Sequence, residues 1–265
     1  MSGAGKTAKA SAVRSAQPAN GQVQSVARAF ALLEELAQED PSSDHAAALP
    51  LADLADRAGL AQPTAHRLLR TLLELGYVRQ LDSRRYVLGP GLIALGERAT
   101  PRLAERARAV LVRLEDAAQE TANLAVLEND LVTYIAQVPS RHRMRMFTEV
   151  GRRVLPHASG VGKAMLATLP ERRVRDLVDR TGLPEYTPTT ITGIDGLLGD
   201  LRETRRRGFA IDDGEQEVGV RCIAVAIPRT EPPAAVSISG PSTRMTDEIV
   251  MRAVTELTRA AEELA

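Results

Sequence analysis

The clearest pattern of apolar and polar positions lies in residues 51–92 of the chain. Over residues 51–58, apolar side chains recur three and four positions apart, which predicts a helix that Gly59 ends. The same spacing returns over residues 63–75 and predicts a second helix, which Gly76 closes. Two short helices joined by a tight turn are therefore the first structural prediction.

After the second helix, apolar and polar positions alternate over residues 77–80 and again over 85–88, which predicts a hairpin. Helix, turn, helix and hairpin is the order of a winged helix-turn-helix, a DNA-binding unit. The polar face of the second helix is formed by His66, Arg67, Arg70, Thr71 and Glu74. Residues 60–91 hold five basic and two acidic side chains, and this surplus of three positive charges is typical of phosphate binding.

Helical patterns also flank this unit. Residues 23–38 predict a helix whose apolar face is formed by Val23, Val26, Ala27, Phe30, Leu33 and Leu36. Residues 91–122 are rich in Ala, Leu, Arg and Glu and are broken once by Pro101, which predicts a helix, an interruption and a longer helix. A connector of this kind either transmits a change of geometry or only packs and dimerises, and the sequence leaves both alternatives open.

From Asn123 the pattern changes to that of strands. A hairpin is expected where residues 124–128 and 131–138 flank the Asn129-Asp130 turn. Further strands are predicted at residues 144–150, 208–211, 221–227 and 234–239. Helices are predicted at residues 160–169, 171–181, 194–207 and 246–264. The expected fold class is α+β, with a mixed antiparallel sheet flanked by helices.

The composition limits the class of protein. A chain of 265 residues is expected to form about two domains, and 44% apolar residues supply a core for each. Because the net charge is +0, DNA binding must rest on local basic surfaces. A single cysteine, with no apolar run of roughly 20 residues, predicts a cytoplasmic protein that does not cross a membrane. Residues 1–22 are small and polar and predict a disordered tail.

Several segments of the sequence resemble one family of regulators. GLAQPTAHRLLRTLLELGYVRQ and RRYVLGPGLIALG are similar to the DNA-binding domain of the IclR-type transcriptional regulators. The similarity continues through HASGVGKAML, TPTTIT and RRRGFAIDDGEQEVGVRCIAVAI. After the predicted disordered tail at residues 1–22, it implies a winged helix-turn-helix at 23–91, a helical linker at 92–122 and a GAF-like effector-binding domain at 123–265.

The DNA-facing residues are expected on the second helix and on the hairpin. Pro63 suits the first helical position, so Gln62 is expected to cap the helix. The candidates are Gln62, Thr64, His66, Arg67 and Arg70 on the helix, and Arg84 and Arg85 at the hairpin tip. The resemblance also places Arg28 near the DNA backbone, although a solvated arginine is an equal alternative. One such unit covers one half-site, so a homodimer or homotetramer on a near-palindromic operator is expected.

Three separated stretches hold the candidate effector site. A Gly-rich segment from His157 to Lys163 opens a helix, and the free N–H groups of a helix N-terminus suit an anion such as a carboxylate. Ser237 and Ser239 lie two residues apart and therefore share one face of a strand. The resemblance implies that one effector pocket is lined by Gly160, Val161, Asp212, Cys222, Ser237 and Ser239.

Each of these candidates also has a structural interpretation. Cys222 can be a small buried apolar side chain, the two serines ordinary strand residues, and residues 212–214 a turn. An ionised Asp212 facing a carboxylate is costly unless the ligand also presents a hydrogen-bond donor. Glyoxylate and allantoate meet this condition, and VPSRHRMRMFTEVGRRVLPHASGVGKAML resembles the allantoin-pathway branch of the family.

An enzyme is the competing class, because GAF-like folds include catalytic members and a Cys222–His157 nucleophilic pair is conceivable. The sequence has no G-x-S-x-G nucleophile elbow, no cysteine cluster and no histidine spacing typical of metal ligands, so neither a cofactor nor a metal is expected. The sequence therefore predicts a ligand-responsive repressor of a catabolic operon that senses a small carboxylate. The alternative is an activator for aromatic-acid catabolism with the same architecture.

Overall fold

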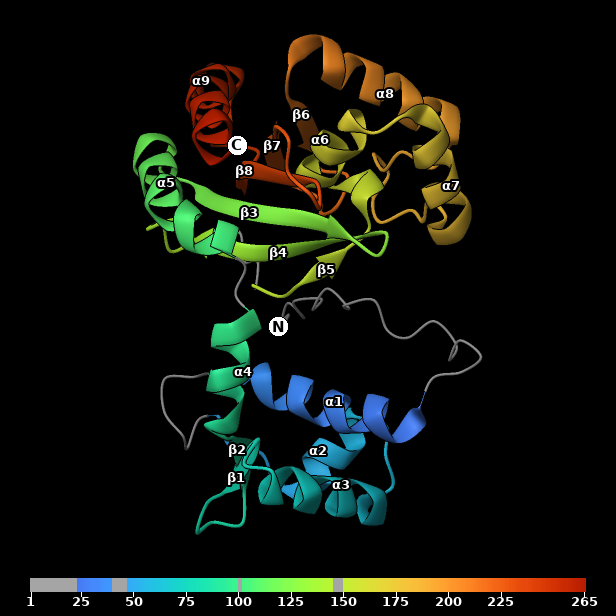
Figure 1. Ribbon diagram of the computed structural model, residues 1–265, viewed down its shortest axis with the longest axis vertical. Helices are drawn as coiled ribbons and strands as arrows, with labels where there is room; N and C mark the ends of the chain where they lie inside the picture. The colour runs from blue at the N-terminus through green and yellow to red at the C-terminus, as the bar shows by residue number, and fades with distance from the viewer. Residues whose placement is uncertain (1–22, 40–46, 100–101, 145–149) are drawn as a thin grey trace, which may run out of the picture. The chain divides into compact units, whose positions relative to one another are not determined.

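The computed structural model describes residues 23–39, 47–99, 102–144 and 150–265. These residues fall into two compact units that divide between Ala99 and Thr100 (Figure 1). The predicted disordered tail and most of the predicted strand at residues 144–150 lie outside the described part. The predicted domain limits stay predictions.

The first unit is a helix-turn-helix followed by a hairpin, as predicted. Its elements are α1 (Gln24–Ala37), α2 (Leu51–Arg57), α3 (Gln62–Glu74), β1 (Val78–Gln80), β2 (Tyr86–Leu88) and α4 (Gly91–Ala99). Its core contains Leu32, Leu36, Leu54, Leu69, Leu72, Val78 and Tyr86. The two strands pair antiparallel, and Tyr86 forms a further backbone bridge with Leu49, which fastens the hairpin to the chain that precedes α2.

The start of α3 differs from the prediction. The helix begins at Gln62 and its N-cap residue is Ala61, so the expectation that Gln62 caps the helix was wrong. Pro63 takes the second helical position, where the backbone N–H also has no acceptor within the helix, and the proline is accommodated without a lost hydrogen bond. Gly59 and Gly76 follow α2 and α3 as predicted, with φ angles of +65° and +76° that favour glycine.

α1 does not bury the whole of its predicted apolar face. Leu33 and Leu36 lie in the core, whereas Val23, Val26 and Phe30 are 63%, 54% and 59% exposed. The reason is that the core of the unit takes up only the C-terminal half of α1. The three exposed side chains are three and four residues apart, so they share one side of the helix.

The second unit is built on a six-stranded sheet with the order β5-β4-β3-β8-β7-β6, and every pairing of its described strands is antiparallel. The strands are β3 (Thr121–Glu128), β4 (Leu131–Val138), β5 (Arg153–Val154), β6 (Ala210–Asp213), β7 (Val220–Ile227) and β8 (Ala234–Pro241). The sequence pattern predicted all of them except β5, which has two residues and therefore shows no alternation.

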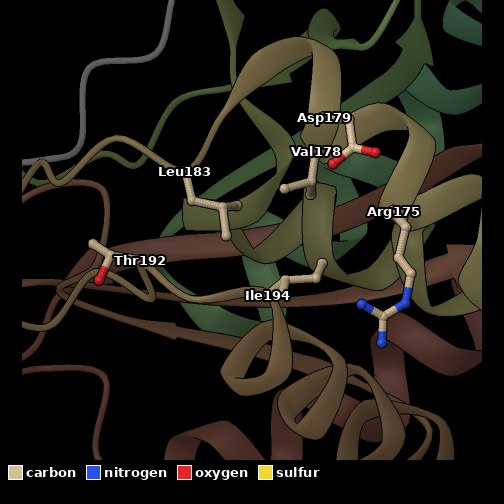
Figure 2. Close-up of a pocket in the computed structure, with 6 residues that line it drawn as sticks. All are labelled: Arg175, Val178, Asp179, Leu183, Thr192 and Ile194. Atoms are coloured by element: carbon tan, nitrogen blue, oxygen red, sulfur yellow. The ribbon is translucent and has the colours of Figure 1, made fainter.

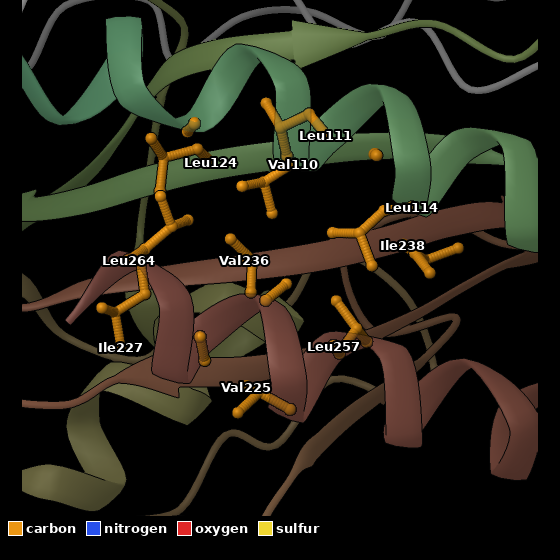
Figure 3. Packing of buried hydrophobic residues seen from close by; sticks show 14 of the residues in the cluster. Val110, Leu111, Leu114, Leu124, Val225, Ile227, Val236, Ile238, Leu257 and Leu264 are labelled. Atoms are coloured by element: carbon orange, nitrogen blue, oxygen red, sulfur yellow. The ribbon is translucent and has the colours of Figure 1, made fainter.

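Helices cover both faces of this sheet (Figure 1). On one face, apolar side chains of α5 (Arg102–Ala118) and α9 (Asp247–Leu264) pack against β3, β7 and β8 (Figure 3). On the other face lies α6 (Gly160–Thr168), with α7 (Glu171–Thr181) and α8 (Ile194–Arg207) beside it. The short 3-10 helix Pro156–Ala158, which the sequence did not predict, precedes α6. Within the described residues, no helix is long and apolar enough to span a membrane.

The two faces of the sheet carry side chains of different kinds. Toward α5 and α9 point large aliphatic residues such as Leu124 and Ile223. Toward α6 point their strand neighbours Asn123, Cys222 and Ser237, which are small or polar. Less side-chain volume on this face allows the first turn of α6 to come close to the strands.

The first turn of α6 also packs tightly on the 3-10 helix before it. A Cβ atom at Gly162 would lie 2.2 Å from the Pro156 carbonyl oxygen, which is backbone and cannot move aside. We therefore predict that Gly162→Ala lowers the free energy of unfolding by about 1–3 kcal/mol through overpacking. Urea denaturation followed by circular dichroism measures this change.

Gly199→Ala is the matched control, because Gly199 lies inside α8 and its added Cβ would meet only Arg202 Nη2, at 3.9 Å. This control is expected to raise the free energy of unfolding by about 0.5–1 kcal/mol, the usual advantage of alanine over glycine within a helix. A Gly162→Ala variant as stable as the wild type would show that α6 does not pack on Pro156 in this way.

Candidate functional site

A row of buried polar side chains crosses the face of the sheet that α6 covers. Asp212 on β6 pairs in register with Cys222 on β7, and Cys222 pairs with Ser239 on β8. Residues paired in register point to the same face, and Ser237 joins them because it lies two residues before Ser239. All four side chains are buried. The sheet thus brings together four of the six predicted effector-site residues.

The other two predicted residues, Gly160 and Val161, form the start of α6 above this row. Ser159 is the N-cap residue, and its Oγ accepts a hydrogen bond of 3.2 Å from the Gly162 N–H. The N–H groups at the first two helical positions, those of Gly160 and Val161, have no acceptor within the helix. A Cβ at Gly160 would lie 2.8 Å from Cys222 Sγ, so only glycine allows this approach. All six predicted residues therefore lie in one place.

Asn123 on β3 also belongs to this row, and sequence analysis missed it. Its Nδ2 lies 3.4 Å from the Oγ atoms of both Ser237 and Ser239. Its Oδ1 accepts a hydrogen bond of 3.1 Å from Gln137 Nε2 on β4. The signal in the sequence was an asparagine inside the otherwise apolar strand TANLAVL, because strands are depleted in asparagine.

A buried lysine ties α6 to the turn after β6. Lys163 is 1% exposed and forms ion pairs with Glu215 and, at 3.2 Å, with Asp200. The Glu215 N–H in turn donates to Asp212 Oδ1 at 2.8 Å. A charged lysine without partners is costly to bury, so this network fixes the turn that follows Asp212 relative to α6. No sequence pattern predicts this network, because ion pairs between distant residues leave no local signal.

A threonine-rich segment holds the same turn from the other side. Thr187 Oγ1 donates to the Gly214 carbonyl at 2.6 Å, and Thr190 Oγ1 donates to the Glu215 carbonyl at 2.7 Å. These residues belong to the TPTTIT motif. The hydroxyl groups satisfy carbonyl groups that a turn leaves without partners, and so they stabilise its conformation.

Burial sets the protonation of the two titratable groups in the row. Burial raises the pKa of the Asp212 carboxyl to about 7, although the hydrogen bond from the Glu215 N–H acts in the opposite direction. Burial also raises the pKa of the Cys222 thiol to about 12. Near neutral pH, Asp212 is therefore partly protonated and able to donate a hydrogen bond, whereas Cys222 is a neutral thiol.

This arrangement does not activate Cys222 as a nucleophile. Reactive cysteines have a lowered pKa and a nearby base, and here the pKa is raised. The other member of the conceivable pair, His157, has its Nε2 at 3.0 Å from the Pro184 carbonyl oxygen and stacks on Tyr186. Burial lowers the pKa of His157, so its ring is neutral and donates to that carbonyl.

A separate cavity of about 430 Å³ lies between α7 and the start of α8 (Figure 2). It is lined by Arg175, Val178, Asp179, Leu183, Thr192 and Ile194. None of the six predicted effector-site residues lines this cavity. The polar row under α6 is buried and is distinct from this cavity.

The predicted DNA-facing residues lie mainly on the outer face of α3. Gln62, His66, Arg67 and Arg70 are exposed and Thr64 is half-buried. Arg70 forms an ion pair of 3.6 Å with Glu74, and an exposed pair of this kind is weak enough to be exchanged for a phosphate.

The remaining predicted DNA contacts lie on other elements of the first unit. Arg84 and Arg85 are exposed in the turn between β1 and β2, where Arg84 has a φ of +61°. Arg28 is half-buried on α1. The structure therefore groups the α3 residues on one surface and the hairpin arginines at its tip.

Two family descriptions match the chain. "Bacterial transcriptional regulator IclR C-terminal" matches residues 99–265, and "IclR helix-turn-helix domain" matches residues 25–82. The Transcriptional repressor IclR of Escherichia coli K12 is 39% identical over 254 residues, which cover 93% of this chain and 90% of that protein.

Solved structures show the same relationship. The Thermotoga maritima IclR has a TM-score of 0.75 and 27% identity, covering 92% of this chain and 98% of that one. An IclR homologue from Microbacterium hydrocarbonoxydans complexed with 4-hydroxybenzoate has a TM-score of 0.73 and 27% identity, covering 91% of this chain and 97% of that one.

The raised pKa of Asp212 gives a pH-dependent prediction for stability. Its value of about 7 in the folded protein lies above the reference value of 3.8, so the folded state binds the proton more tightly than the unfolded state. The stabilising contribution of this proton is fully present below about pH 4 and is lost as pH rises through 7. Asp212→Asn removes this loss because the amide stays neutral.

We expect the free energy of unfolding of Asp212→Asn, relative to wild type, to increase by up to a few kcal/mol between pH 4 and 8. Denaturant titrations at several pH values measure the free energy of unfolding of both proteins. Subtracting one from the other largely cancels the titration of all other groups. Curves that stay parallel over this range would contradict the raised pKa of Asp212.

Proposed function

Because this chain belongs to the IclR family of bacterial transcriptional regulators, we propose that it is a repressor whose binding to operator DNA is controlled by a small carboxylate. The observation that carries the proposal is the row of buried polar groups beneath the N-terminus of α6. A helix N-terminus favours an anion, and the serines and Asp212 supply polar partners beside it. Such a combination suits a ligand with one carboxylate and few other atoms.

Glyoxylate and allantoate are the favoured effectors. Asp212 is buried with a pKa of about 7, so its protonated form donates to a ligand and its ionised form accepts from one. A hydrated 2-oxo acid or a ureido acid presents both a carboxylate and donors, and so matches the two ends of the site. The close approach of Gly160 to Cys222 favours a small ligand.

An aromatic acid is the second candidate effector, with an activator of aromatic-acid catabolism as the corresponding function. Its support is the solved relative that is complexed with 4-hydroxybenzoate, together with the cavity between α7 and α8. That cavity offers Arg175 for a carboxylate and Leu183 and Ile194 for a ring. The buried row favours the smaller acids, because its polar groups converge at one place.

For DNA, we propose that α3 enters the major groove and that the hairpin arginines contact phosphates or the minor groove. The exposed arginines of α3 and the local positive charge support this arrangement. Arg28 is proposed to contact the DNA backbone.

A homodimer or homotetramer would place two such units on a near-palindromic operator. The exposed stripe of Val23, Val26 and Phe30 supports self-association, since clustered apolar side chains on a surface commonly mark an interface. Effector binding would shift a balance between arrangements of the DNA-binding units through the connector at residues 92–122. The shift is limited to the difference in effector affinity between those arrangements.

Fluorescence anisotropy of DNA from upstream of the protein's own gene tests the ligand-controlled repressor. We expect tight, salt-sensitive binding that glyoxylate or allantoate releases. Ser239→Ala should bind the DNA as tightly as wild type but need at least about tenfold more acid for the same release, whereas the exposed Ser242→Ala should behave as wild type. If only 4-hydroxybenzoate releases the DNA, the aromatic acid becomes the supported effector. If no acid changes DNA binding, the proposal of a carboxylate effector is wrong.

The roles of two arginines give a further prediction. Arg67→Ala is expected to weaken specific binding by about 1–3 kcal/mol while leaving non-specific binding nearly unchanged, because a base contact carries sequence information. Arg84→Ala is expected to weaken both and to reduce the dependence of affinity on salt, because a phosphate contact releases counterions. Titrations of operator and scrambled DNA at several salt concentrations measure both effects. Equal losses on both DNAs for Arg67→Ala would exclude a base contact.

A further inference from the structure

Asn123 is fully buried at the centre of three neighbouring strands. It pairs in register with Gln137 on β4 and with Ser237 on β8. A buried primary amide must satisfy two donor hydrogens and an acceptor oxygen, and here each of them has a partner. The amide nitrogen faces the two serines and the amide oxygen faces Gln137.

The geometry assigns one hydrogen of the Asn123 amide to each serine. Both Oγ atoms lie 3.4 Å from the same nitrogen, and a primary amide carries two hydrogens. Gln137 donates to Asn123 Oδ1 at 3.1 Å, which holds the amide in this orientation. Each serine oxygen is therefore an acceptor on the side of Asn123.

This assignment determines what the serines can offer to a ligand. A hydroxyl group has a single hydrogen, and a serine that accepts from Asn123 keeps that hydrogen for another partner. Both hydroxyl groups have the Cys222 sulfur within hydrogen-bonding reach, and Cys222 lies directly below Gly160. The hydrogens of Ser237 and Ser239 therefore lie on the side of Cys222, where the start of α6 meets the sheet.

We propose that Asn123, oriented by Gln137, is a positioning residue that makes Ser237 and Ser239 two hydrogen-bond donors toward the effector site. With the N–H groups at the start of α6, the site then presents donors to a group that only accepts, such as a carboxylate. This inference rests on the proposed function, because it explains how the same site selects an anion.

The opposite orientation of the amide makes the opposite prediction. If Asn123 Oδ1 faced the serines, it would accept both hydroxyl hydrogens, and the serines would present only lone pairs to a ligand. Such a site would favour a donor group over a carboxylate. The two orientations differ by a half-turn of the Asn123 amide, with the Gln137 amide turning as well so that its oxygen accepts from Asn123. Locating the amide hydrogens of Asn123 distinguishes them.

Nuclear magnetic resonance of protein labelled with ¹⁵N in asparagine alone locates the NH2 hydrogens of Asn123 without any ligand. The chain has only three asparagines, Asn20, Asn123 and Asn129, and loss of one signal in Asn123→Ala assigns the Asn123 amide. We expect nuclear Overhauser effects from both of its NH2 hydrogens to the β-hydrogens of Ser237 and Ser239. If the Asn123 NH2 hydrogens instead show nuclear Overhauser effects to the Gln137 side chain, the proposal is overturned, whatever the effector is.

Asn123→Asp then tests the consequence for specificity, with glyoxylate and its neutral amide as probes in calorimetric titrations. The carboxylate would accept the serine hydrogens, so the serines would turn their lone pairs toward the ligand. We expect wild type to prefer glyoxylate by at least about tenfold. The variant should prefer the amide of glyoxylate and bind it more tightly than wild type does. Neither partial unfolding of the variant nor its added negative charge alone would produce this gain in affinity.

Asn129→Asp, the same change at an exposed turn, is the control and should leave both affinities unchanged. A parallel loss of both probes in Asn123→Asp would mean that Asn123 only supports the fold, and would overturn the proposal. If the NH2 hydrogens face the serines but wild type binds neither probe, the proposed effector fails while the assigned orientation of Asn123 stands.

Discussion

The second unit depends on the close approach of one helix end to the middle of a sheet. The first turn of α6 reaches Cys222 because Gly160 has no side chain and because the strand residues below it are small. Larger residues at these positions would push the helix outward, and the N–H groups at its start would then face water. The approach therefore brings backbone donors close to buried polar side chains, in surroundings that strengthen electrostatic interactions.

An enclosed polar site is stable only if its groups satisfy one another. Lys163 neutralises Glu215, and the Glu215 N–H supports Asp212. Asn123 fills the corresponding role for Ser237 and Ser239. Breaking one of these contacts leaves an unpaired group in the interior, which costs more than the contact itself contributes.

The first unit follows a different physical logic. Its core is a small set of mostly aliphatic side chains, and the residues proposed to contact DNA lie outside it on α3 and in the β1–β2 turn. DNA is a large, regular anion, so exposed arginines on a rigid helix suffice to meet it, whereas a small effector must be surrounded. The proposed function thus assigns an exposed surface to DNA and a buried group of polar side chains to a small effector.

The sequence by itself determined most of the elements, because helical and strand periodicities and the turn glycines are local signals, and its resemblance to known regulators indicated the family. It also named Gly160, Asp212, Cys222 and Ser239, but only through resemblance. The tertiary structure decided how much of the apolar face of α1 is buried and how strand register aligns Asp212, Cys222 and Ser239. It also decided that Asn123 and Lys163 bind the polar groups around them. The physical reason is that register, burial and hydrogen-bond partners join residues far apart in the chain, and no local pattern records them.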